Sequence, residues 1–325
     1  MRAAVLAGYG SLRIGDVAKP EPAGEDVLVR VHATSLNAVD WYGFTGRPWV
    51  ARPIMGIRKP RSGELGADFA GVVEAVGPGV EGLAPGEQVY GHRSGAFAEY
   101  VLASDAVVRK PANLSFEEAA AVPVAAFTAL QGLRDHATVQ TGQRVLVNGA
   151  SGGVGTFAVQ IAKALGAMVD AVCSTANVAQ SRDLGADRVF DYTREDFTRS
   201  GARYDVIFDV AGSRRARAVR RVLAPGGTLV LVGGPRGRLL GPLGHIARAK
   251  LAPKGRGRTA VFFVAKPTSD DLVALRELIE AGEVKPVIEH RYDFPQIEDA
   301  MRRIGTGHAR AKLVVTVDGG SSGAG

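Results

Sequence analysis

The clearest pattern along the chain is a short apolar run followed, after a glycine-rich turn, by apolar residues at helical spacing. Residues 144–148 have the sequence Arg-Val-Leu-Val-Asn, which is typical of a buried parallel strand. Apolar side chains then recur at positions 154, 157, 158, 161, 162 and 165, which share one face of a helix. The pattern predicts a strand, a tight turn and an amphipathic helix in succession.

The alternation of strands and helices continues to about residue 264. Gly185 ends one predicted helix, and Pro225-Gly226-Gly227 forms a turn before a later strand. The alternation predicts an α/β fold with a doubly wound parallel sheet. Its further strands are expected at 168–173, 188–190, 205–209, 228–232 and 261–264, and its further helices at 176–184 and 214–223.

The first part of the chain has a different pattern. Short apolar or alternating runs such as 3–7, 27–32 and 71–76 are separated by glycine and proline turns, which predicts a small β-rich, barrel-like domain. Ser115 and Glu118 form a capping box, which predicts that a helix begins there.

The last part returns to the β-rich pattern. Thr268 or Ser269 is expected to cap a helix that runs to Ala281 and ends at Gly282. Short strands and one helix then follow, and we expect them to rejoin the first domain. The predicted domains are therefore 1–121 (β-rich), 122–264 (parallel α/β), 265–318 (the return segment) and 319–325 (a disordered Gly/Ser-rich tail).

The turn after residue 148 carries glycines where a dinucleotide site needs them. Ala150, Gly152 and Gly155 give the pattern A-x-G-x-x-G, with Gly153 in addition. Gly152 would let phosphates approach the backbone, and Gly155 would let helix and strand pack closely. The helix N-terminus offers N–H groups and a partial positive charge to a pyrophosphate. The turn predicts dinucleotide binding; a turn of the same shape that binds no phosphate is the alternative.

The end of the next strand bears on the choice of cofactor. An acidic residue there would favour NAD, but Asp170 comes too early, within the strand pattern. Ser174, Thr175 and Asn177 follow the strand and offer hydrogen bonds to a 2′-phosphate. This favours NADPH, although Ser174 and Asn177 would also serve as caps of the following helix.

Composition limits the class of protein. The 325 residues are 46% hydrophobic and 22% charged, which is ordinary for a globular protein with two cores. The single cysteine, Cys173, excludes an internal disulfide framework and a cysteine-ligated zinc site, and its apolar context predicts a buried side chain. No apolar run is long enough to span a membrane, and residues 3–7 are too short for a signal-peptide core. We expect a cytoplasmic protein with no membrane partner.

The net charge of +7 is unevenly distributed. Residues 213–268 contain thirteen Lys or Arg and no acidic residue, which leaves 27 positive against 33 negative residues elsewhere. Such a segment suggests an anionic partner: cofactor phosphates, a CoA thioester or nucleic acid. A solvated arginine-rich face is the alternative reading of the same segment.

Taken together, these pieces closely resemble the zinc-free quinone oxidoreductase-like branch of the medium-chain dehydrogenase/reductase superfamily, over nearly the whole chain. Each motif is weak alone, but their order and co-occurrence are specific. The matching stretches are SLNAVD at 35–40, GADFAGVV at 66–73, VG at 76–77, GAFAEY at 95–100, KP at 110–111, GASGGVG at 149–155, LGAD at 184–187 and PGG at 225–227.

The resemblance implies a GroES-like catalytic domain built from both chain ends around a Rossmann domain, and a homodimer. Zinc-dependent relatives carry cysteine and histidine ligands, including a Gly-His-Glu stretch where this chain has Gly66-Ala67-Asp68. His32 and His92 alone would make a poor zinc site. We therefore expect no metal.

Three residues are the candidate catalytic residues by this resemblance. Tyr42 stands where similar quinone reductases carry a tyrosine facing the nicotinamide, and its phenol would donate a hydrogen bond or proton to the substrate oxygen. Water would serve as well, in which case Tyr42 only walls the pocket. Asn37 is expected to orient the ribose or carboxamide of the cofactor, and Asp40 to fix the loop.

The remaining cofactor contacts are carried over by position. Phe262 and Phe263 are equally consistent with core strand residues. The set comprises Thr128 at the domain junction; Ser151, Gly152, Gly153 and Val154 at the pyrophosphate; Ser174, Thr175 and Asn177 at the 2′-phosphate; Tyr192 near the adenine; Val210, Val232 and Gly233 at strand ends; Phe262 and Phe263 at the nicotinamide; and Lys312 at a phosphate.

The leading interpretation is an NADPH-dependent, zinc-independent oxidoreductase that transfers hydride to quinones or to activated C=C bonds of enones and 2-alkenals. An enoyl-CoA or enoyl-thioester reductase is the alternative, because the basic segment suits a CoA phosphate. An NADPH-responsive binding protein with little catalysis is an alternative of another class. Aromatic residues do not interleave with the basic ones, so nucleic acid is not expected as a partner.

Overall fold

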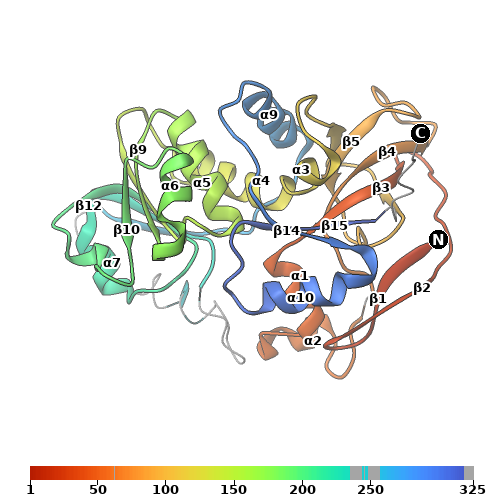
Figure 1. Ribbon diagram of the computed structural model, residues 1–325, viewed down its shortest axis with the longest axis horizontal. Helices are drawn as coiled ribbons and strands as arrows, with labels where there is room; N and C mark the ends of the chain where they lie inside the picture. Colours follow the sequence, from red (N-terminus) through yellow and green to blue (C-terminus); the bar gives the residue numbers. More distant parts are fainter. Residues whose placement is uncertain (62, 235–243, 245, 248–256, 318–325) are drawn as a thin grey trace. The chain divides into compact units, whose positions relative to one another are not determined.

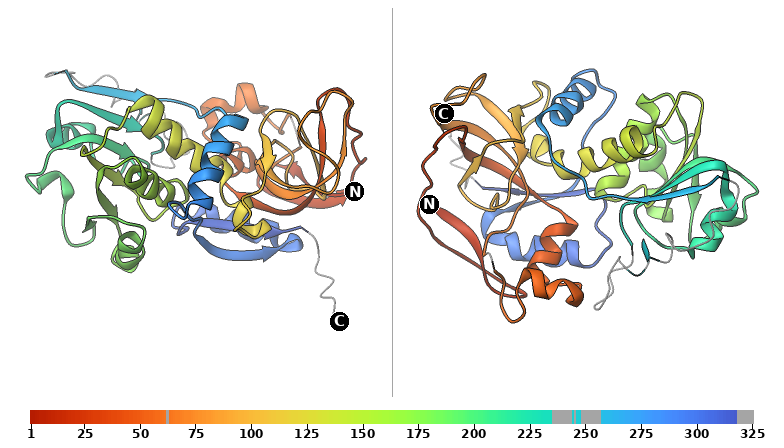
Figure 2. Two further views of the ribbon diagram at one scale, coloured as in Figure 1. Left: turned by 90° about the horizontal axis from the view of Figure 1, so that it is seen from above. Right: turned by 180° about the vertical axis from the view of Figure 1, so that it is seen from behind.

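The computed structural model describes residues 1–61, 63–234, 244, 246–247 and 257–317 (Figures 1 and 2). Contacts divide the chain into two compact units, which are treated separately below. Unit 1 comprises Met1–Ala125, Pro267–Ala281 and the described residues from Pro286 onward; unit 2 comprises the described residues of Ala126–Lys266 together with Gly282–Lys285. In the described part of the chain no helix is long and apolar enough to cross a membrane.

Unit 2 is built on a six-stranded sheet in which every neighbouring pair is parallel. The strand order is β10-β9-β8-β11-β12-β13, so the order reverses beside β8, as in a doubly wound dinucleotide fold. The predicted α/β class is confirmed. The strands are β8 (Arg144–Asn148), β9 (Met168–Cys173), β10 (Arg188–Asp191), β11 (Tyr204–Asp209), β12 (Leu223–Leu231) and β13 (Thr259–Phe262).

Helical segments connect the successive strands from β8 to β12, and the 3.6-residue periodicity predicts those that follow β8, β9 and β11. Buried apolar side chains of the strands and of α7, among them Leu146, Ile207 and Val219, form the core of the unit. The segment expected as one helix at 176–184 is a 3₁₀ turn, η3 (Thr175–Asn177), followed by α6 (Val178–Asp183). The other helical segments are α4 (Pro123–Gln131), which begins in unit 1, η2 (Gly132–His136), α5 (Gly153–Ala164), η4 (Phe197–Arg199) and α7 (Ala216–Val222).

The glycine-rich turn between β8 and α5 brings the helix close to the strand. A Cβ atom at Gly155 would lie 2.1 Å from the carbonyl oxygen of Gly149, so only glycine fits there. A Cβ atom at Gly152 would meet nothing nearer than 3.6 Å, again the oxygen of Gly149. Packing within the protein therefore requires glycine at 155 but not at 152.

Two strands of unit 2, β12 and β13, differ from their predicted bounds by more than one residue, whereas β10 and β11 are each one residue longer than predicted. The turn expected at 225–227 lies inside β12, where Leu223 pairs with Tyr204 and the next pair joins Thr228 to Val206. Gly226, with φ of +75°, lets the chain loop out without leaving the strand. The last strand was predicted at 261–264 but ends at Phe262, and Val264 is exposed.

Unit 1 contains a mostly antiparallel seven-stranded sheet and a separate hairpin. Its path is β14-β15-β3-β4-β5-β7, with β6 also paired to β3, and only the β14–β15 pair is parallel. The last two strands of the chain thus extend the sheet of the first strands (Figure 1). The strands are β1 (Arg2–Gly8), β2 (Ser11–Asp16), β3 (Val27–Leu36), β4 (Asp68–Val76), β5 (Gln88–His92), β6 (Tyr100–Ala103), β7 (Val107–Arg109), β14 (Ile288–Asp293) and β15 (Lys312–Thr316).

Short helices flank this sheet, and their predicted caps are confirmed. The Ser115 hydroxyl accepts from the Glu118 N–H at 3.2 Å, and the Glu118 carboxylate accepts from the Ser115 N–H at 2.9 Å. Thr268, rather than Ser269, caps the late helix. The helical segments are α1 (Ala38–Thr45), η1 (Trp49–Ala51), α2 (Arg52–Met55), α3 (Phe116–Ala120), α9 (Ser269–Glu280), η5 (Phe294–Gln296) and α10 (Ile297–Gly305), and α10 packs against α1 (Figure 1).

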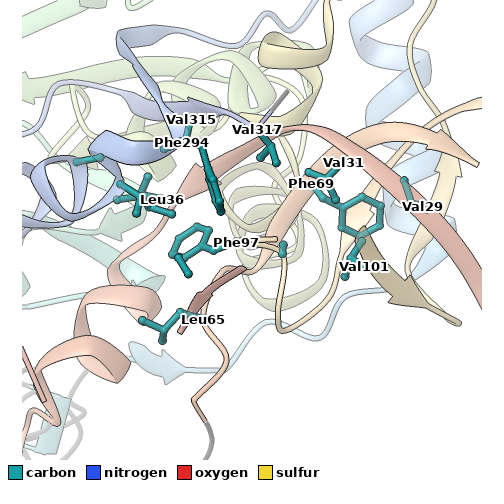
Figure 3. Close-up of a cluster of buried hydrophobic side chains, with 14 of the residues drawn as sticks. Val29, Val31, Leu36, Leu65, Phe69, Phe97, Val101, Phe294, Val315 and Val317 are labelled. Carbon is teal, nitrogen blue, oxygen red and sulfur yellow. The ribbon is translucent and has the colours of Figure 1, made fainter. Parts of the chain in front are cut away.

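The core of unit 1 joins the two ends of the chain. Leu36, Phe97 and Phe294 are buried in one cluster with Val315, as Figure 3 shows. Because β3 and β15 both contribute to this cluster, the residues at the end of β3 and at the start of β15 are held in fixed positions.

Two expectations fall largely or wholly outside the described residues. Within the basic segment, the stretch 233–258 is described only at residues 233–234, 244, 246–247 and 257–258, and the predicted tail at 319–325 is not described. Most of the central part of the basic segment lies in the same range.

Candidate active site

A buried polar network lies in unit 1 where β3, β4 and β15 meet. Lys312 is 2% exposed and Asp68 is fully buried. The Lys312 Nζ atom donates to the Asn37 Oδ1 atom at 2.6 Å and contacts the Asp68 Oδ2 atom at 3.1 Å. The same carboxylate oxygen accepts from the Ser35 hydroxyl and from the Asn37 side-chain amide, both at 2.8 Å. The Asp68 Oδ1 atom accepts from the Val124 N–H at 2.9 Å.

Strand pairing brings these groups together. Ser35 lies opposite Asp68 in the β3–β4 ladder, and Leu36 lies opposite Leu313 in the β15–β3 ladder. Asn37 follows β3 directly, and Lys312 is the first residue of β15. Removing two charges from water is costly, and here that cost is offset by the ion pair and by hydrogen bonds to both carboxylate oxygens.

Asp40 forms the second part of the network. Its carboxylate accepts from the Asn37 N–H at 2.7 Å and from the Gly66 N–H at 3.2 Å. Burial raises the pKa of Asp40 to about 7, and the nearby Asp68 carboxylate adds to this, while the two N–H donors and Lys312 act in the opposite direction. Asp40 therefore ties the start of α1 to the segment before β4.

Tyr42 is half-buried on α1, two residues after Asp40. Asn37 is 7% exposed, and its side chain is engaged by Asp68 and Lys312. The structure gives no support to the predicted contact of Lys312 with a cofactor phosphate, because its ammonium group is enclosed within unit 1. The return of the chain through β15 carries this side chain inward.

His32 and His92, which sequence analysis considered as zinc ligands, both lie in unit 1. His32 stacks on Phe116 with a centroid distance of 4.4 Å, and burial lowers the pKa of His92. Within the described ranges, no three His, Cys, Asp or Glu side chains gather as ligands for a metal ion.

The N-terminus of α5 in unit 2 fits a dinucleotide pyrophosphate. Gly152 caps this twelve-residue helix, and no side chain bonds to the cap. Ser151, Gly152, Gly153 and Val154 are all half-buried. A Cβ atom at Gly152 would touch no protein atom closely, so glycine there leaves space for a ligand rather than for the protein. The N–H groups of the first turn are placed to donate to phosphate oxygens.

The carboxyl ends of β9 and β10 bring the predicted ribose contacts together. The Asn177 side-chain amide donates to the Ser174 hydroxyl oxygen at 3.0 Å, which leaves the Ser174 O–H to donate elsewhere. The Thr175 hydroxyl donates to Asp191 at 2.6 Å, and this bond lowers the pKa of Asp191. Tyr192, 49% exposed, bonds through its N–H to the Cys173 carbonyl at 3.0 Å.

Strand ends near the switch point gather the other predicted contacts. The Val210 N–H donates to the Asn148 carbonyl, and the Val232 N–H to the Asp209 carbonyl, both at 3.0 Å. Gly233 follows Val232 at the same edge, its N–H 3.4 Å from the Asp209 carbonyl.

The aromatic pair and Thr128 also lie in unit 2. Phe262 packs partly against the core, and the Phe263 ring lies 4.3 Å from the His136 ring. Thr128 is half-buried on α4. Their predicted cofactor contacts stay predictions.

Sequence analysis missed two buried carboxylates that organise these sites. Asp68 was noted only as the residue in place of a zinc ligand. Asp209 accepts from the Asn148 side-chain amide at 2.7 Å and from the Gly212 N–H at 2.9 Å. The available signal was an acidic residue at the end of a strand: Asp68 is the first residue of β4, and Asp209 is the last residue of β11.

Comparisons with known proteins agree with this architecture. Residues 23–112 match the family model of the alcohol dehydrogenase GroES-like domain, and residues 184–315 match that of the zinc-binding dehydrogenases. The chain is 33% identical to the 2-methylene-furan-3-one reductase of Solanum lycopersicum, over 97% of this chain and 79% of that protein. It is 32% identical to the chloroplastic NADPH-dependent alkenal/one oxidoreductase of Arabidopsis thaliana, with the same coverage.

A solved structure shows the same fold over nearly the whole length. The quinone oxidoreductase of Coxiella burnetii superposes with a TM-score of 0.85 at 30% identity, covering 98% of this chain and 99% of that one.

Breaking the buried Lys312–Asp68 ion pair should cause a large loss of stability, and replacing the second charged residue as well should restore much of it. Lys312→Met should lower the free energy of unfolding by about 4 kcal/mol, because Asp68 would remain buried and uncompensated. Adding Asp68→Asn should recover more than half of this loss. Urea unfolding measures both variants. Lys19→Met, which breaks the exposed 2.8 Å pair with Glu74, is the control and should change the free energy of unfolding far less than Lys312→Met. A double variant no more stable than the single one would contradict the prediction.

Asp40 predicts a pH dependence of stability. The pKa of Asp40 is about 7 in the folded protein, against an ordinary value of 3.8. Between these two pH values Asp40 is therefore protonated in the folded state and ionised in the unfolded chain. This contribution to the free energy of unfolding is complete below about pH 4 and falls by about 1.4 kcal/mol per pH unit until about pH 7. Asp40→Asn cannot titrate. The stability of the wild type relative to this variant should therefore decline from about pH 5 to about pH 7 in urea unfolding, and a constant difference would exclude the raised pKa.

Proposed function

The chain belongs to the zinc-free quinone oxidoreductase-like branch of the medium-chain dehydrogenase/reductase superfamily, and we propose that it uses NADPH to reduce quinones or activated C=C bonds. That it is an oxidoreductase with a nicotinamide cofactor follows from the family. The printed names of its relatives, an alkenal/one oxidoreductase, a furanone reductase and a quinone oxidoreductase, support the choice of electron-poor acceptors.

The glycine-lined N-terminus of α5 is the observation that carries the cofactor proposal. The N–H groups of Gly152, Gly153 and Val154 would hold the pyrophosphate, with Ser151 beside them. Val210, Val232 and Gly233, at the carboxyl ends of β11 and β12, would border the rest of the dinucleotide. When bound, the reduced nicotinamide supplies a hydride.

The preference for NADPH rests on the end of β9. Asp170 is not available there, because its carboxylate accepts from the Tyr204 hydroxyl at 2.7 Å and pairs with Arg144 at 3.2 Å. Ser174 keeps a hydroxyl proton to donate to a 2′-phosphate, and Thr175 and Asn177 lie beside it. The Asp191 carboxylate is occupied by hydroxyl donors from Thr175 and Thr193.

Unit 1 supplies the groups for the acceptor. We assign Tyr42 as the donor of a hydrogen bond or proton to the acceptor oxygen, where negative charge develops during reduction. Asn37 and Asp40 hold the first turn of α1, so they position Tyr42 rather than touch the acceptor themselves. The Lys312–Asp68 pair fixes Asn37 in turn.

The first test is NADPH oxidation by the full chain, with a metal chelator present. The acceptors are a benzoquinone, an enone, a 2-alkenal and an enoyl-CoA, with NADH run alongside and enzyme-free blanks. We expect turnover that survives the chelator and a higher kcat/KM with NADPH than with NADH. Ser174→Ala should raise KM for NADPH and leave KM for NADH unchanged.

The outcomes separate the alternatives. Enoyl-CoA as the best acceptor would replace the proposal by an enoyl-thioester reductase, which the thirteen basic residues of 213–268 would favour. Equal use of NADH and NADPH would overturn the assignment of Ser174. Tight NADPH binding without turnover of any acceptor would favour a cofactor-responsive binding protein.

Tyr42→Phe tests the role of the phenol. The variant keeps the ring and loses only the hydroxyl, so kcat should fall about a hundredfold while KM for NADPH stays the same. Tyr292→Phe is the matched control and should retain kcat, because Tyr292 lies on β14 and is not among the candidate site residues. A Tyr42→Phe enzyme with unchanged kcat would show that Tyr42 is only a wall of the pocket.

A further inference from the structure

Half of the large hydrophobic side chains that the described residues expose fall within nine positions of unit 1. Trp49 is 46% exposed, Val50 52%, Ile54 77% and Ile57 69%. The other four are scattered through the sequence, at Val39, Met168, Tyr192 and Val264. We call the four clustered side chains the 49–57 patch. It lies on η1 and α2 and in the turn that follows them (Figures 1 and 2).

The segment around the patch is strongly basic. No acidic residue occurs between Asp40 and Glu64, whereas five basic ones do: Arg47, Arg52, Arg58, Lys59 and Arg61. Three of them, Arg58, Lys59 and Arg61, are exposed directly after the patch. Exposed apolar and positively charged side chains therefore follow one another within one short segment of the chain.

Specific contacts hold this segment in place although its apolar side chains remain exposed. The Tyr9 hydroxyl donates to the Gly56 carbonyl at 2.6 Å. The Arg52 guanidinium lies 4.7 Å from the centre of the Tyr9 ring and 5.9 Å from that of Trp49, and its Nε atom donates to the Gly46 carbonyl at 3.1 Å. The fold thus presents the patch on a defined backbone.

The sequence led us to expect no membrane partner, because no apolar segment is long enough to span a bilayer; binding at a bilayer surface needs no such segment. We propose that the 49–57 patch binds the surface of an anionic lipid bilayer. Tryptophan and branched aliphatic side chains enter the boundary between headgroups and acyl chains, and nearby Lys and Arg are attracted to anionic headgroups. Shallow insertion of separate side chains needs no complementary groove, which favours a bilayer over an acidic protein as the occupant. The proposal rests on the patch alone and does not depend on the proposed reductase activity.

Vesicle sedimentation of the full chain tests the proposal. The protein should sediment with vesicles of equal parts phosphatidylcholine and phosphatidylserine, and about tenfold less with phosphatidylcholine alone. The triple variant Trp49→Ser/Ile54→Ser/Ile57→Ser should lose about tenfold in binding, and so should Arg58→Gln/Lys59→Gln/Arg61→Gln. Thermal unfolding checks that each variant is folded.

A second basic surface provides the matched control. Arg215, Arg217 and Arg221 are exposed in unit 2, and replacing all three by Gln removes the same charge. This control should keep vesicle binding within about twofold of the wild type if binding is local to the patch. Equal losses in both arginine-containing triple variants would overturn the assignment to the patch.

Fluorescence separates insertion from simple adsorption by charge. The chain has two tryptophans, so Trp41→Phe leaves Trp49 as the only one. Its emission should shift to the blue on phosphatidylserine-containing vesicles, because the indole enters a less polar environment. Sedimentation without this shift, or no sedimentation at all, would overturn the proposal. Retention on polyglutamate without vesicle binding would indicate an acidic protein partner instead.

Discussion

A positive charge that the last strand carries into the interior constrains much of unit 1. Lys312 and Asp68 are both withdrawn from water, and such a pair is tolerated only where the remaining hydrogen-bonding capacity is filled. Ser35, Asn37 and the Val124 N–H fill it on the carboxylate, and Asn37 accepts from the ammonium group. These donors come from the end of β3 and the start of α4, while the charges come from β4 and β15. The network therefore fixes four parts of the chain against one another.

The candidate catalytic helix begins at this network. Asn37 precedes α1, and its side chain is bound by Asp68 and Lys312. The Asp40 carboxylate, in the first turn of α1, accepts from the Asn37 N–H. Tyr42 is too close to these residues along an eight-residue helix to move independently of them. A helix this short has little stability of its own, so its geometry depends on tertiary contacts: the buried carboxylates at its start and α10 along its side. The position of the Tyr42 side chain therefore depends, through Asn37, on Lys312 near the other end of the sequence.

Structure that depends on residues close together in the sequence was predictable, whereas structure that depends on long-range strand pairing was not. β8 and β9 have their predicted bounds, and the caps at Ser115 and Thr268 are formed, because periodicity and capping act within a few residues. The Lys312–Asp68 contact joins residues 244 positions apart and depends on the order β15-β3-β4, which no local pattern encodes. For this reason the sequence led us to predict a cofactor phosphate, and not Asp68, as the partner of Lys312. The glycine turn was readable because its requirements, close packing at Gly155 and space at Gly152, lie within one strand–helix unit.

The two units share one physical device at their candidate sites. In each, an asparagine that ends or follows a strand donates its side-chain amide to a buried carboxylate on the neighbouring strand: Asn37 to Asp68 at 2.8 Å, and Asn148 to Asp209 at 2.7 Å. Asn148 and Asp209 are opposite each other in the β8–β11 ladder, and Ser35, two residues before Asn37, is opposite Asp68 in the β3–β4 ladder. The Gly212 N–H donates to the Asp209 carboxylate and so orders the turn that follows Val210. Because each amide reaches its carboxylate only when the strands are in register, the conformation of the loops that follow is set by strand pairing rather than by the loops' own residues.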